Sequence, residues 1–158
     1  MENGYELRKT ATKGEGIFAT KPFKAGETVL VGMIEKVLEK NDSHATQIGE
    51  DTYVRYAGLI IKTNHSCSPN CGVKENKAGV HALVAMKDIS IDEEITFDYA
   101  MRNYTIAFFP DDNCTCGSEQ CRGKISGWKD LPEEKKQEYK GKGFVVPYLL
   151  ELDNKLGF

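Results

Sequence analysis

Short apolar stretches, separated by turns rich in glycine and charge, fill the first part of the chain. Each stretch is only a few residues long and carries β-branched or aromatic side chains, which is typical of β-strands. The strands predicted in this part are 5–10, 17–20, 28–33, 34–37 and 44–48. Turns are expected at 13–16, 24–27 and 41–43, and residues 53–56 fit either a strand or a helical turn.

The same pattern continues through the middle of the chain. An apolar run at 59–61 ends in a polar loop at 64–71, which indicates a buried segment that arrives at a loop. Strands are predicted at 80–85 and 95–99, on either side of a charged turn at 88–94. The middle of the chain therefore adds strands to the same predominantly β pattern.

The C-terminal part changes from strand patterns to helical ones. Asp130, Pro132 and Glu133 form the start signal of a charged helix. That helix is predicted over 133–140 and is expected to end at Gly141.

A second C-terminal helix is predicted over 147–156. Leu149, Leu152 and Leu156 recur there at helical spacing, and we expect them to pack onto the rest of the domain. Two helices after a long series of strands predict a mainly β fold, in the class of β-rich α+β proteins.

Composition narrows the class of protein. The chain has 158 residues, of which 40% are hydrophobic and 28% charged, which suits one domain with its own core and argues against disorder. A formal net charge of -3 does not favour a phosphate-binding surface, so no direct contact with nucleic acid is expected. No apolar stretch is long enough to cross a membrane, no signal peptide is recognised, and no membrane partner is expected. The five cysteines, an odd number, favour reduced, metal-binding thiols in an intracellular protein of the cytoplasm or nucleus.

The polar loop at 64–71 presents an imidazole and two thiols, those of His65, Cys67 and Cys71. Pro69 restricts the backbone, and the asparagine and serine side chains can bond to nearby peptide groups, so a rigid loop is expected. The closeness of His65 to Cys67 suggests a nucleophile and its base, but neighbouring side chains on an extended loop point apart. A structural hydrogen bond of His65 and a metal bond of Cys67 are the favoured interpretation.

Three more thiols, those of Cys114, Cys116 and Cys121, are close enough in sequence to converge on one metal ion. Zinc in a structural site takes four tetrahedral ligands, so a fourth thiol is needed, and Cys67 or Cys71 could supply it. Such a site would join two distant segments of the chain and stabilise the fold. An iron–sulfur cluster is the alternative for four thiolates.

The motifs resemble those of the SET-domain protein lysine methyltransferases. Residues 64–70 and 93–99 are similar to the pair of hallmark motifs of that family, and residues 114–123 resemble its post-SET zinc motif. Residues 13–18 resemble the glycine turn that binds the cofactor in this family. The motifs follow the family's order from about residue 5 to residue 127.

The resemblance implies a SET-domain fold in which a C-terminal segment threads under a loop. It implies a SET domain at 1–112, a post-SET zinc motif at 113–127 and a helical extension at 128–158. It implies zinc held by Cys67, Cys114, Cys116 and Cys121, with Cys71 left as an unpaired, buried thiol. S-adenosylmethionine would be bound by Lys13, Gly14, Glu15, Gly16, Ile17, Tyr53, Asn64, His65 and Tyr99.

The resemblance also implies an activity, S-adenosylmethionine-dependent N-methylation of a protein lysine. Tyr99 would be the catalytic residue, and Phe97 would line the lysine channel and favour the addition of more than one methyl group. The substrate would be a basic protein or peptide, with histone as the usual family substrate. A catalytically inactive, zinc-stabilised SET-like interaction module is the alternative.

Two departures from the family pattern affect the expected lysine channel. Residues 61–63 replace the usual arginine–phenylalanine pair, and Leu30 with Val31 stands where many relatives have a tyrosine. Tyr104 or Tyr56 could compensate for the missing aromatic side chains.

Overall fold

The computed structural model describes residues 4–11, 14–40, 45–49, 51–75, 80–106 and 114–156. Its strands are β1 (Tyr5–Lys9), β2 (Glu15–Ala19), β3 (Thr28–Val31), β4 (Met33–Leu38), β5 (Thr46–Gly49), β6 (Thr52–Ala57), β7 (Asn64–His65), β8 (Cys71–Glu75), β9 (His81–Ala85) and β10 (Glu94–Phe97). Its helices are α1 (Glu133–Lys142) and α2 (Pro147–Leu156), with short 3-10 turns η1 (Leu59–Lys62), η2 (Tyr99–Met101) and η3 (Trp128–Asp130). The predicted mainly β fold with C-terminal helices is confirmed.

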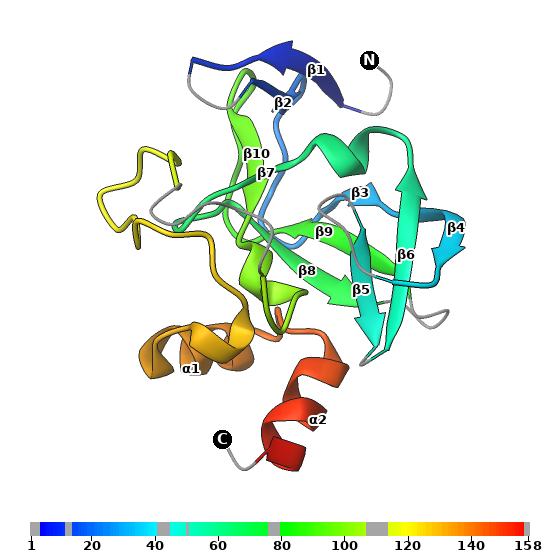
Figure 1. Ribbon diagram of the computed structural model, residues 1–158. Helices are drawn as coiled ribbons and strands as arrows, with labels where there is room; N and C mark the ends of the chain where they lie inside the picture. Colours follow the sequence, from blue (N-terminus) through cyan, green and yellow to red (C-terminus); the bar gives the residue numbers. More distant parts are fainter. Residues whose placement is uncertain are drawn as a thin grey trace.

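The described strands form two sheets (Figure 1). The larger has the order β1-β2-β10-β8-β9-β3, with β7 paired to β10, and the smaller has the order β4-β6-β5. In Figure 1 the two C-terminal helices lie at the end of the molecule opposite β1. Phe144, between the helices, covers β8 at Gly72, where a Cβ atom would clash with the Phe144 ring. The helices therefore close one end of the core.

Strand β10 organises the part of the fold that carries the expected chemistry. It pairs antiparallel with β2, so that Ile95 faces Ile17, and parallel with β7, so that Phe97 faces His65. This parallel pairing brings the loop after residue 63 beside the strand that precedes Tyr99. The threaded passage that the resemblance implies stays an expectation, because residues 107–113 lie outside the described part of the chain.

Most predicted strands are confirmed, with shifted boundaries. The long apolar run from residue 28 divides at Gly32, where a Cβ atom would lie 2.9 Å from the ring of Tyr56. Residues 53–56 are strand, within β6, because they pair with both β4 and β5. The run at 59–61 forms η1 and buries only Ile60. The turn expected at 41–43 and the strand start at residue 44 lie outside the described residues.

The predicted end of the first helix was wrong, and so was its cap. The helix α1 continues through Gly141 to Lys142 and ends at Gly143, whose φ of 76° suits glycine. Asp130 lies in η3, and no side chain caps α1. The bounds of α2 are as predicted; Leu149 and Leu152 are buried, and the side chain of Leu156 is outside the described residues.

Candidate active site

The β7–β10 pairing places His65 and Tyr99 in direct contact. The backbone N–H of Tyr99 donates a hydrogen bond to His65 Nδ1 at 3.1 Å. The two rings meet edge to face, with 5.3 Å between their centroids. The structure thus brings together two residues that the sequence places in the expected site.

The phenol of Tyr99 is held by the backbone of the segment before β7. Its hydroxyl group donates to the carbonyl oxygen of Thr63 at 2.8 Å. Burial raises the pKa of Tyr99, so the phenol keeps its proton at neutral pH. The oxygen atom of Tyr99 can therefore act only as an acceptor toward a further group. Sequence reasoning missed Thr63 because a backbone carbonyl leaves no signal in residue type.

Phe97 and Tyr99 form the aromatic wall of this site. Phe97 is fully buried, and its ring lies 4.9 Å from that of Tyr99, tilted by 42°. The guanidinium of Arg102 lies over both rings, 4.6 Å from the Phe97 centroid and 5.6 Å from the Tyr99 centroid. The pairing of Phe97 with Tyr99 agrees with the channel expected from the sequence, whereas Arg102 was not anticipated.

His65 connects this aromatic wall to the first cysteine. Because Nδ1 accepts the N–H of Tyr99, the proton of a neutral imidazole lies on Nε2. His65 Nε2 is 3.4 Å from the Sγ atom of Cys67, so the ring donates to the sulfur. An imidazole in this tautomer cannot take a proton from Cys67, which argues against a nucleophile–base pair and for a structural contact.

Four cysteines converge beside this contact. The Sγ atoms of Cys67, Cys114, Cys116 and Cys121 all lie within 4.8 Å of one another. Zn–S bonds of about 2.3 Å in a tetrahedron place sulfur atoms about 3.8 Å apart. The Sγ atoms of Cys67 and Cys114 are separated by 3.8 Å, which fits a single ion better than a cluster that needs several atoms between the thiolates.

The fifth cysteine, Cys71, does not belong to this group. It lies in β8, has no exposed surface and pairs with Phe97 and Ala85 of the neighbouring strands. Burial raises the pKa of its thiol to about 12. Of the two candidates for the fourth ligand, the fold brings only Cys67 to the other three.

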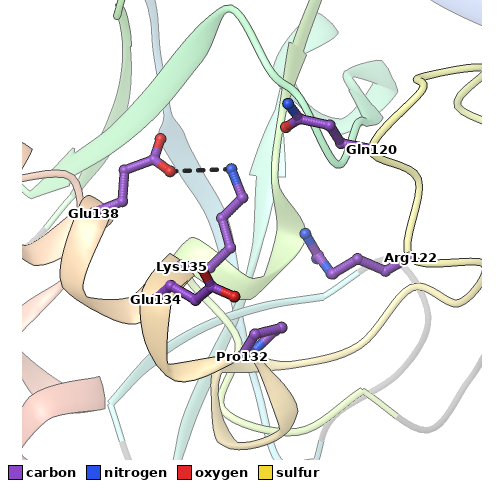
Figure 2. Close-up of a pocket in the computed structure, with 6 residues that line it drawn as sticks. All are labelled: Gln120, Arg122, Pro132, Glu134, Lys135 and Glu138. Atoms are coloured by element: carbon purple, nitrogen blue, oxygen red, sulfur yellow. Dashed lines mark hydrogen bonds and ion pairs between the residues drawn. The ribbon is translucent and has the colours of Figure 1, made fainter.

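A surface pocket of about 360 Å³ lies where the cysteine segment, residues 114–127, meets α1 (Figure 2). Its lining residues are Gln120, Arg122, Pro132, Glu134, Lys135 and Glu138. Lys135 and Glu138 form an ion pair at 3.1 Å in its wall. This pocket is lined by neither His65 nor Tyr99. Arg122 is the lining residue that reaches inward from it, to Asp98.

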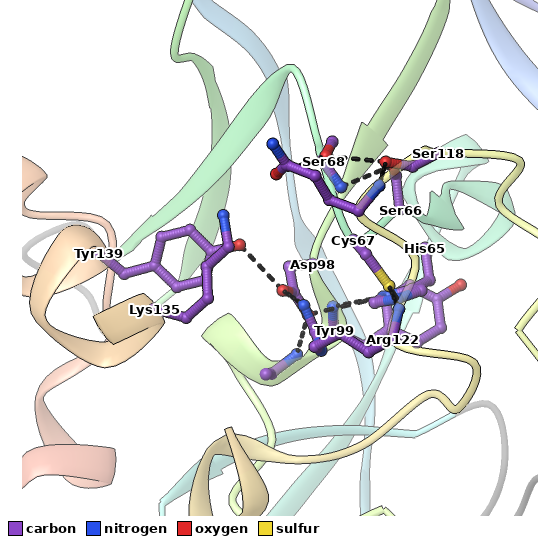
Figure 3. Close-up of polar contacts among 12 residues, drawn as sticks. His65, Ser66, Cys67, Ser68, Asp98, Tyr99, Ser118, Arg122, Lys135 and Tyr139 are labelled. Atoms are coloured by element: carbon purple, nitrogen blue, oxygen red, sulfur yellow. Dashed lines mark hydrogen bonds and ion pairs between the residues drawn. The ribbon is translucent and has the colours of Figure 1, made fainter. Parts of the chain in front are cut away.

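Asp98 is fully buried and joins three parts of the chain (Figure 3). Its two oxygen atoms accept hydrogen bonds from both terminal nitrogens of Arg122, at 2.9 and 3.0 Å. The hydroxyl group of Tyr139, in α1, donates to the same carboxylate at 2.9 Å. Burial lowers the pKa of Arg122, but the hydrogen bonds to Asp98 outweigh burial and raise it, so the guanidinium stays charged.

Arg122 also touches the cysteine cluster through its backbone. Its N–H donates to the Sγ atom of Cys67 at 3.3 Å. Arg122 therefore joins Asp98 to Cys67. Because Cys67 also contacts His65, and His65 accepts the N–H of Tyr99, one continuous network connects the cysteine segment to Tyr99. Sequence reasoning did not identify the Asp98–Arg122 pair, although a charged residue directly before Tyr99, at the end of an apolar strand, is a signal that a partner exists.

The glycine turn at 14–16 lies against the polar loop at 64–71, hereafter the central loop. Gly14 has a φ of 73°, and no atom of the described residues beyond its chain neighbours lies within 4 Å of the place where its Cβ would be. A Cβ atom on Gly16 would lie 2.8 Å from Asn64 Nδ2, and that amide donates to the carbonyl oxygen of Glu15 at 2.8 Å. The turn and Asn64 thus form one surface with open space beside Gly14, as a bound cofactor would require. Lys13, expected at the same turn, lies outside the described residues.

The comparison with protein families decides the identity of the fold. The family model described as the SET domain matches residues 14–100, more than half of the chain. This chain belongs to the SET domain family.

Several histone-lysine N-methyltransferases are similar to this SET domain. The enzyme ash1 of Drosophila melanogaster is 32% identical over 150 residues, which cover 78% of this chain and 6% of ash1. The human SETD1A is 32% identical over 136 residues, which cover 70% of this chain and 7% of SETD1A. The chain therefore spans only a small part of these relatives.

Solved structures support the same fold. The structure of KRYPTONITE with mCHH DNA, an H3(1-15) peptide and SAH superposes with a TM-score of 0.61 and 24% identity. The superposition covers 77% of this chain and 29% of KRYPTONITE. At this identity the likeness establishes the SET fold alone.

The other tyrosines expected at the site of this SET domain lie on β6 or beside α2. Tyr53 is half-buried on β6, in the smaller sheet. The Tyr104 hydroxyl lies 3.1 Å from Asp153 of α2, which also accepts the indole N–H of Trp128 at 2.7 Å. Tyr104 thereby ties α2 to the core, and this placement does not favour a role in the lysine channel. Tyr56, the other compensating candidate, is buried beneath Gly32 and accepts the backbone N–H of His81 at 3.1 Å.

No helix in the described ranges of this SET domain is both long and apolar enough to span a membrane.

Proposed function

We propose that this SET domain is an S-adenosylmethionine-dependent protein-lysine N-methyltransferase. The observation that carries the proposal is the position of the Tyr99 phenol. Its hydroxyl group is hydrogen-bonded to the carbonyl oxygen of Thr63, and its ring contacts those of His65 and Phe97. The names of its relatives, histone-lysine N-methyltransferases, support the same reaction class.

Tyr99 is the proposed catalytic residue because its hydroxyl proton is already committed to Thr63. A substrate amine can then only donate an N–H to the Tyr99 oxygen, which turns the nitrogen lone pair away from the phenol. Such alignment is what a displacement at a methyl carbon needs, and orientation alone can contribute about 7–11 kcal/mol to a reaction of two bound groups. Phe97 would form the wall of the same channel.

The lysine must lose a proton before it can attack. A free lysine side chain has a pKa of about 10.4, and burial in an apolar channel disfavours its charged form. The buried ring of Phe97 and the half-buried ring of Tyr99 supply such surroundings. The bound ammonium passes this proton to solvent before methyl transfer.

We assign the cofactor to the surface formed by the glycine turn and the central loop. Gly14, Glu15, Gly16 and Ile17 would contribute backbone, and Asn64 and His65 would approach from β7; the open space at Gly14 supports this assignment. When bound, S-adenosylmethionine supplies a methyl group on a positively charged sulfur. Lys13, Tyr53 and the Tyr99 ring complete the proposed binding set.

We assign zinc to Cys67, Cys114, Cys116 and Cys121, because the spacing of their sulfur atoms fits a tetrahedral ion. The metal would cross-link the cysteine segment to the central loop, because the four ligands come from both. On this basis residues 1–112 form the proposed SET domain, 113–127 the post-SET motif and 128–158 a helical extension.

The proposed substrate is a basic protein or peptide with a lysine. The H3(1-15) peptide in the KRYPTONITE structure and the names of the relatives favour a histone tail. A substrate of this class places the reaction inside the cell, in the nucleus or cytoplasm.

The test is incubation with radiolabelled S-adenosylmethionine and a panel of basic proteins that includes the core histones. We expect label on lysine side chains of at least one of them, identified by mass spectrometry of tryptic peptides. Tight binding of a basic peptide that is unaffected by S-adenosylmethionine, with no label on any protein, would instead establish the inactive interaction module.

A further inference from the structure

Arg102 places a positive charge directly behind the aromatic wall of the site. It follows η2, and its guanidinium carbon lies 4.6 Å from the centroid of Phe97 and 5.6 Å from that of Tyr99. Distances in this range are those of a cation resting on aromatic faces. Both rings are thus already engaged by a cation on one side.

The charge on Arg102 is not neutralised by an acid. Across the described ranges of the chain, no carboxylate forms an ion pair with it, and its Nε atom is buried without a hydrogen-bond partner. Burial lowers the pKa of Arg102, but a guanidinium starts from 12.5 and stays charged at neutral pH. Arg102 as a whole is half-buried, and partial desolvation of a cation without an acidic partner costs folding free energy, so its retention beside the reacting groups points to a role.

The groups that face Arg102 from other elements do not cancel its charge. They are Tyr56 of β6, His81 of β9 and Tyr148 of α2, with Glu75 of β8 acting on the two tyrosines and Glu94 of β10 acting on Tyr99. Burial raises the pKa of Tyr56 and of Tyr148 and lowers that of His81 to about 3, so all three are uncharged at neutral pH.

The two acids near Arg102 have other partners. Glu94 Oε2 accepts a hydrogen bond from Asn64 Nδ2 at 2.9 Å. Glu75 Oε1 lies 3.8 Å from His81 Nε2. Within the described residues, Arg102 therefore places its charge at this wall without a carboxylate partner.

We propose that Arg102 is a positioning residue that makes the aromatic wall of Phe97 and Tyr99 select the uncharged form of the target lysine. The inference deepens the proposed methyltransferase function and rests on it. A ring that carries a cation on one face attracts a second cation on the other face poorly, and the two positive charges repel one another through the ring. An ammonium entering the channel is disfavoured on both counts, whereas a neutral amine is not.

The expected size of the effect follows from Coulomb's law. An amine on the opposite side of either ring would lie about 9 Å from the guanidinium, and at an effective dielectric constant of about 20 this displaces its pKa by about one unit. Arg102 would act through the electrostatics of the two rings and without touching the amine itself.

The test is the pH dependence of kcat for methylation of a histone peptide labelled by the wild type. The acidic limb of a kcat profile reports the ionisation of the enzyme–substrate complex, here that of the bound amine. We expect Arg102→Met to move the midpoint of this limb up by about one pH unit, and Arg102→Lys, which keeps the charge, to leave it within a few tenths of a unit. Arg102→Gln provides a second neutral variant if the methionine variant does not fold.

Lys74→Met is the matched control. Lys74 also holds a cation over an aromatic ring, 5.0 Å from the centroid of Phe144, but on the helix side of β8. Its profile should coincide with that of the wild type. An unshifted midpoint in a folded, active Arg102→Met would overturn the inference and leave the proposed function standing, whereas absence of transfer by the wild type at every pH would overturn the function itself.

Discussion

Both terminal nitrogens of Arg122 donate hydrogen bonds to the carboxylate of Asp98, at 2.9 and 3.0 Å. Asp98 is the residue directly before Tyr99, and Arg122 directly follows Cys121. One bidentate pair therefore ties the end of β10 to the cysteine segment. Because the pair is buried, the position of Tyr99 depends on contacts made by a distant part of the chain.

Removal of the Arg122 guanidinium should destabilise the protein strongly. In Arg122→Met the buried Asp98 carboxylate loses two charged hydrogen bonds, and the loss of one partner of such a pair costs about 3–5 kcal/mol. Urea unfolding at pH 7 measures the change in the free energy of unfolding. Lys142→Met is the control, because it breaks only the exposed pair with Glu138, where about 0.5 kcal/mol is expected. Equal losses in the two variants would contradict the role given to Asp98.

Replacement of the phenol should separate catalysis from cofactor binding. Tyr99→Phe keeps the ring against His65 and Phe97 but removes the oxygen that would orient the amine. We expect methyl transfer to fall by about 10²-fold or more, since misplaced reactants lose rate on this scale. The affinity for S-adenosylmethionine, measured by titration calorimetry, should change less than about threefold. Undiminished turnover in this variant would exclude Tyr99 as the catalytic residue.

The cysteine assignment predicts the metal content of single variants. Elemental analysis of the purified wild type should give one zinc per chain, held by the four clustered thiols. Cys116→Ser should lose most of the zinc and melt at a lower temperature, because a structural site contributes folding free energy. Cys71→Ala removes the buried thiol of β8 and should keep the metal. Iron with inorganic sulfide in the wild type, or zinc lost from Cys71→Ala, would show that the ligand set is different.

The buried imidazole of His81 predicts acid sensitivity. Burial lowers the pKa of His81 from 6.5 to about 3, so the unfolded chain takes up a proton that the folded chain does not, over the range between these values. Stability is therefore unaffected by this group above pH 6.5, declines as the pH falls below it and levels off near pH 3. By pH 5 the wild type should lose about 2 kcal/mol through this group.

His81→Gln provides the comparison for the acid effect, because glutamine does not titrate. Urea unfolding at pH 7 and at pH 5 measures the free energy of unfolding of both proteins. Between these pH values the wild type should lose about 2 kcal/mol more than the variant. A constant difference would mean that His81 takes up its proton over the same pH range in the folded and the unfolded protein, which would contradict the lowered pKa.

Features that depend on neighbouring residues in the chain were accessible from the sequence. Short apolar runs with β-branched or aromatic side chains, bounded by turns, sufficed for most of the strands, and leucine spacing sufficed for the bounds of α2, because these signals are local in the chain. The cysteine motif and the hallmark motifs around Asn64 and Tyr99 identified the family for the same reason, since each is a short run of specific residue types. The end of α1 failed because two glycines compete there, and only the backbone shows that Gly143 adopts the left-handed conformation.

The contacts that define the site depended on how distant segments meet. The choice of Cys67 over Cys71 and the Thr63 carbonyl that holds Tyr99 follow from the register of β7, β8 and β10. The pairing of Asp98 with Arg122 follows from the cysteine segment lying against the end of β10, and Tyr104 contacts α2. Residue types limit which partners a side chain can accept, but its actual partner is set by the packing of strands and helices that are remote in the chain.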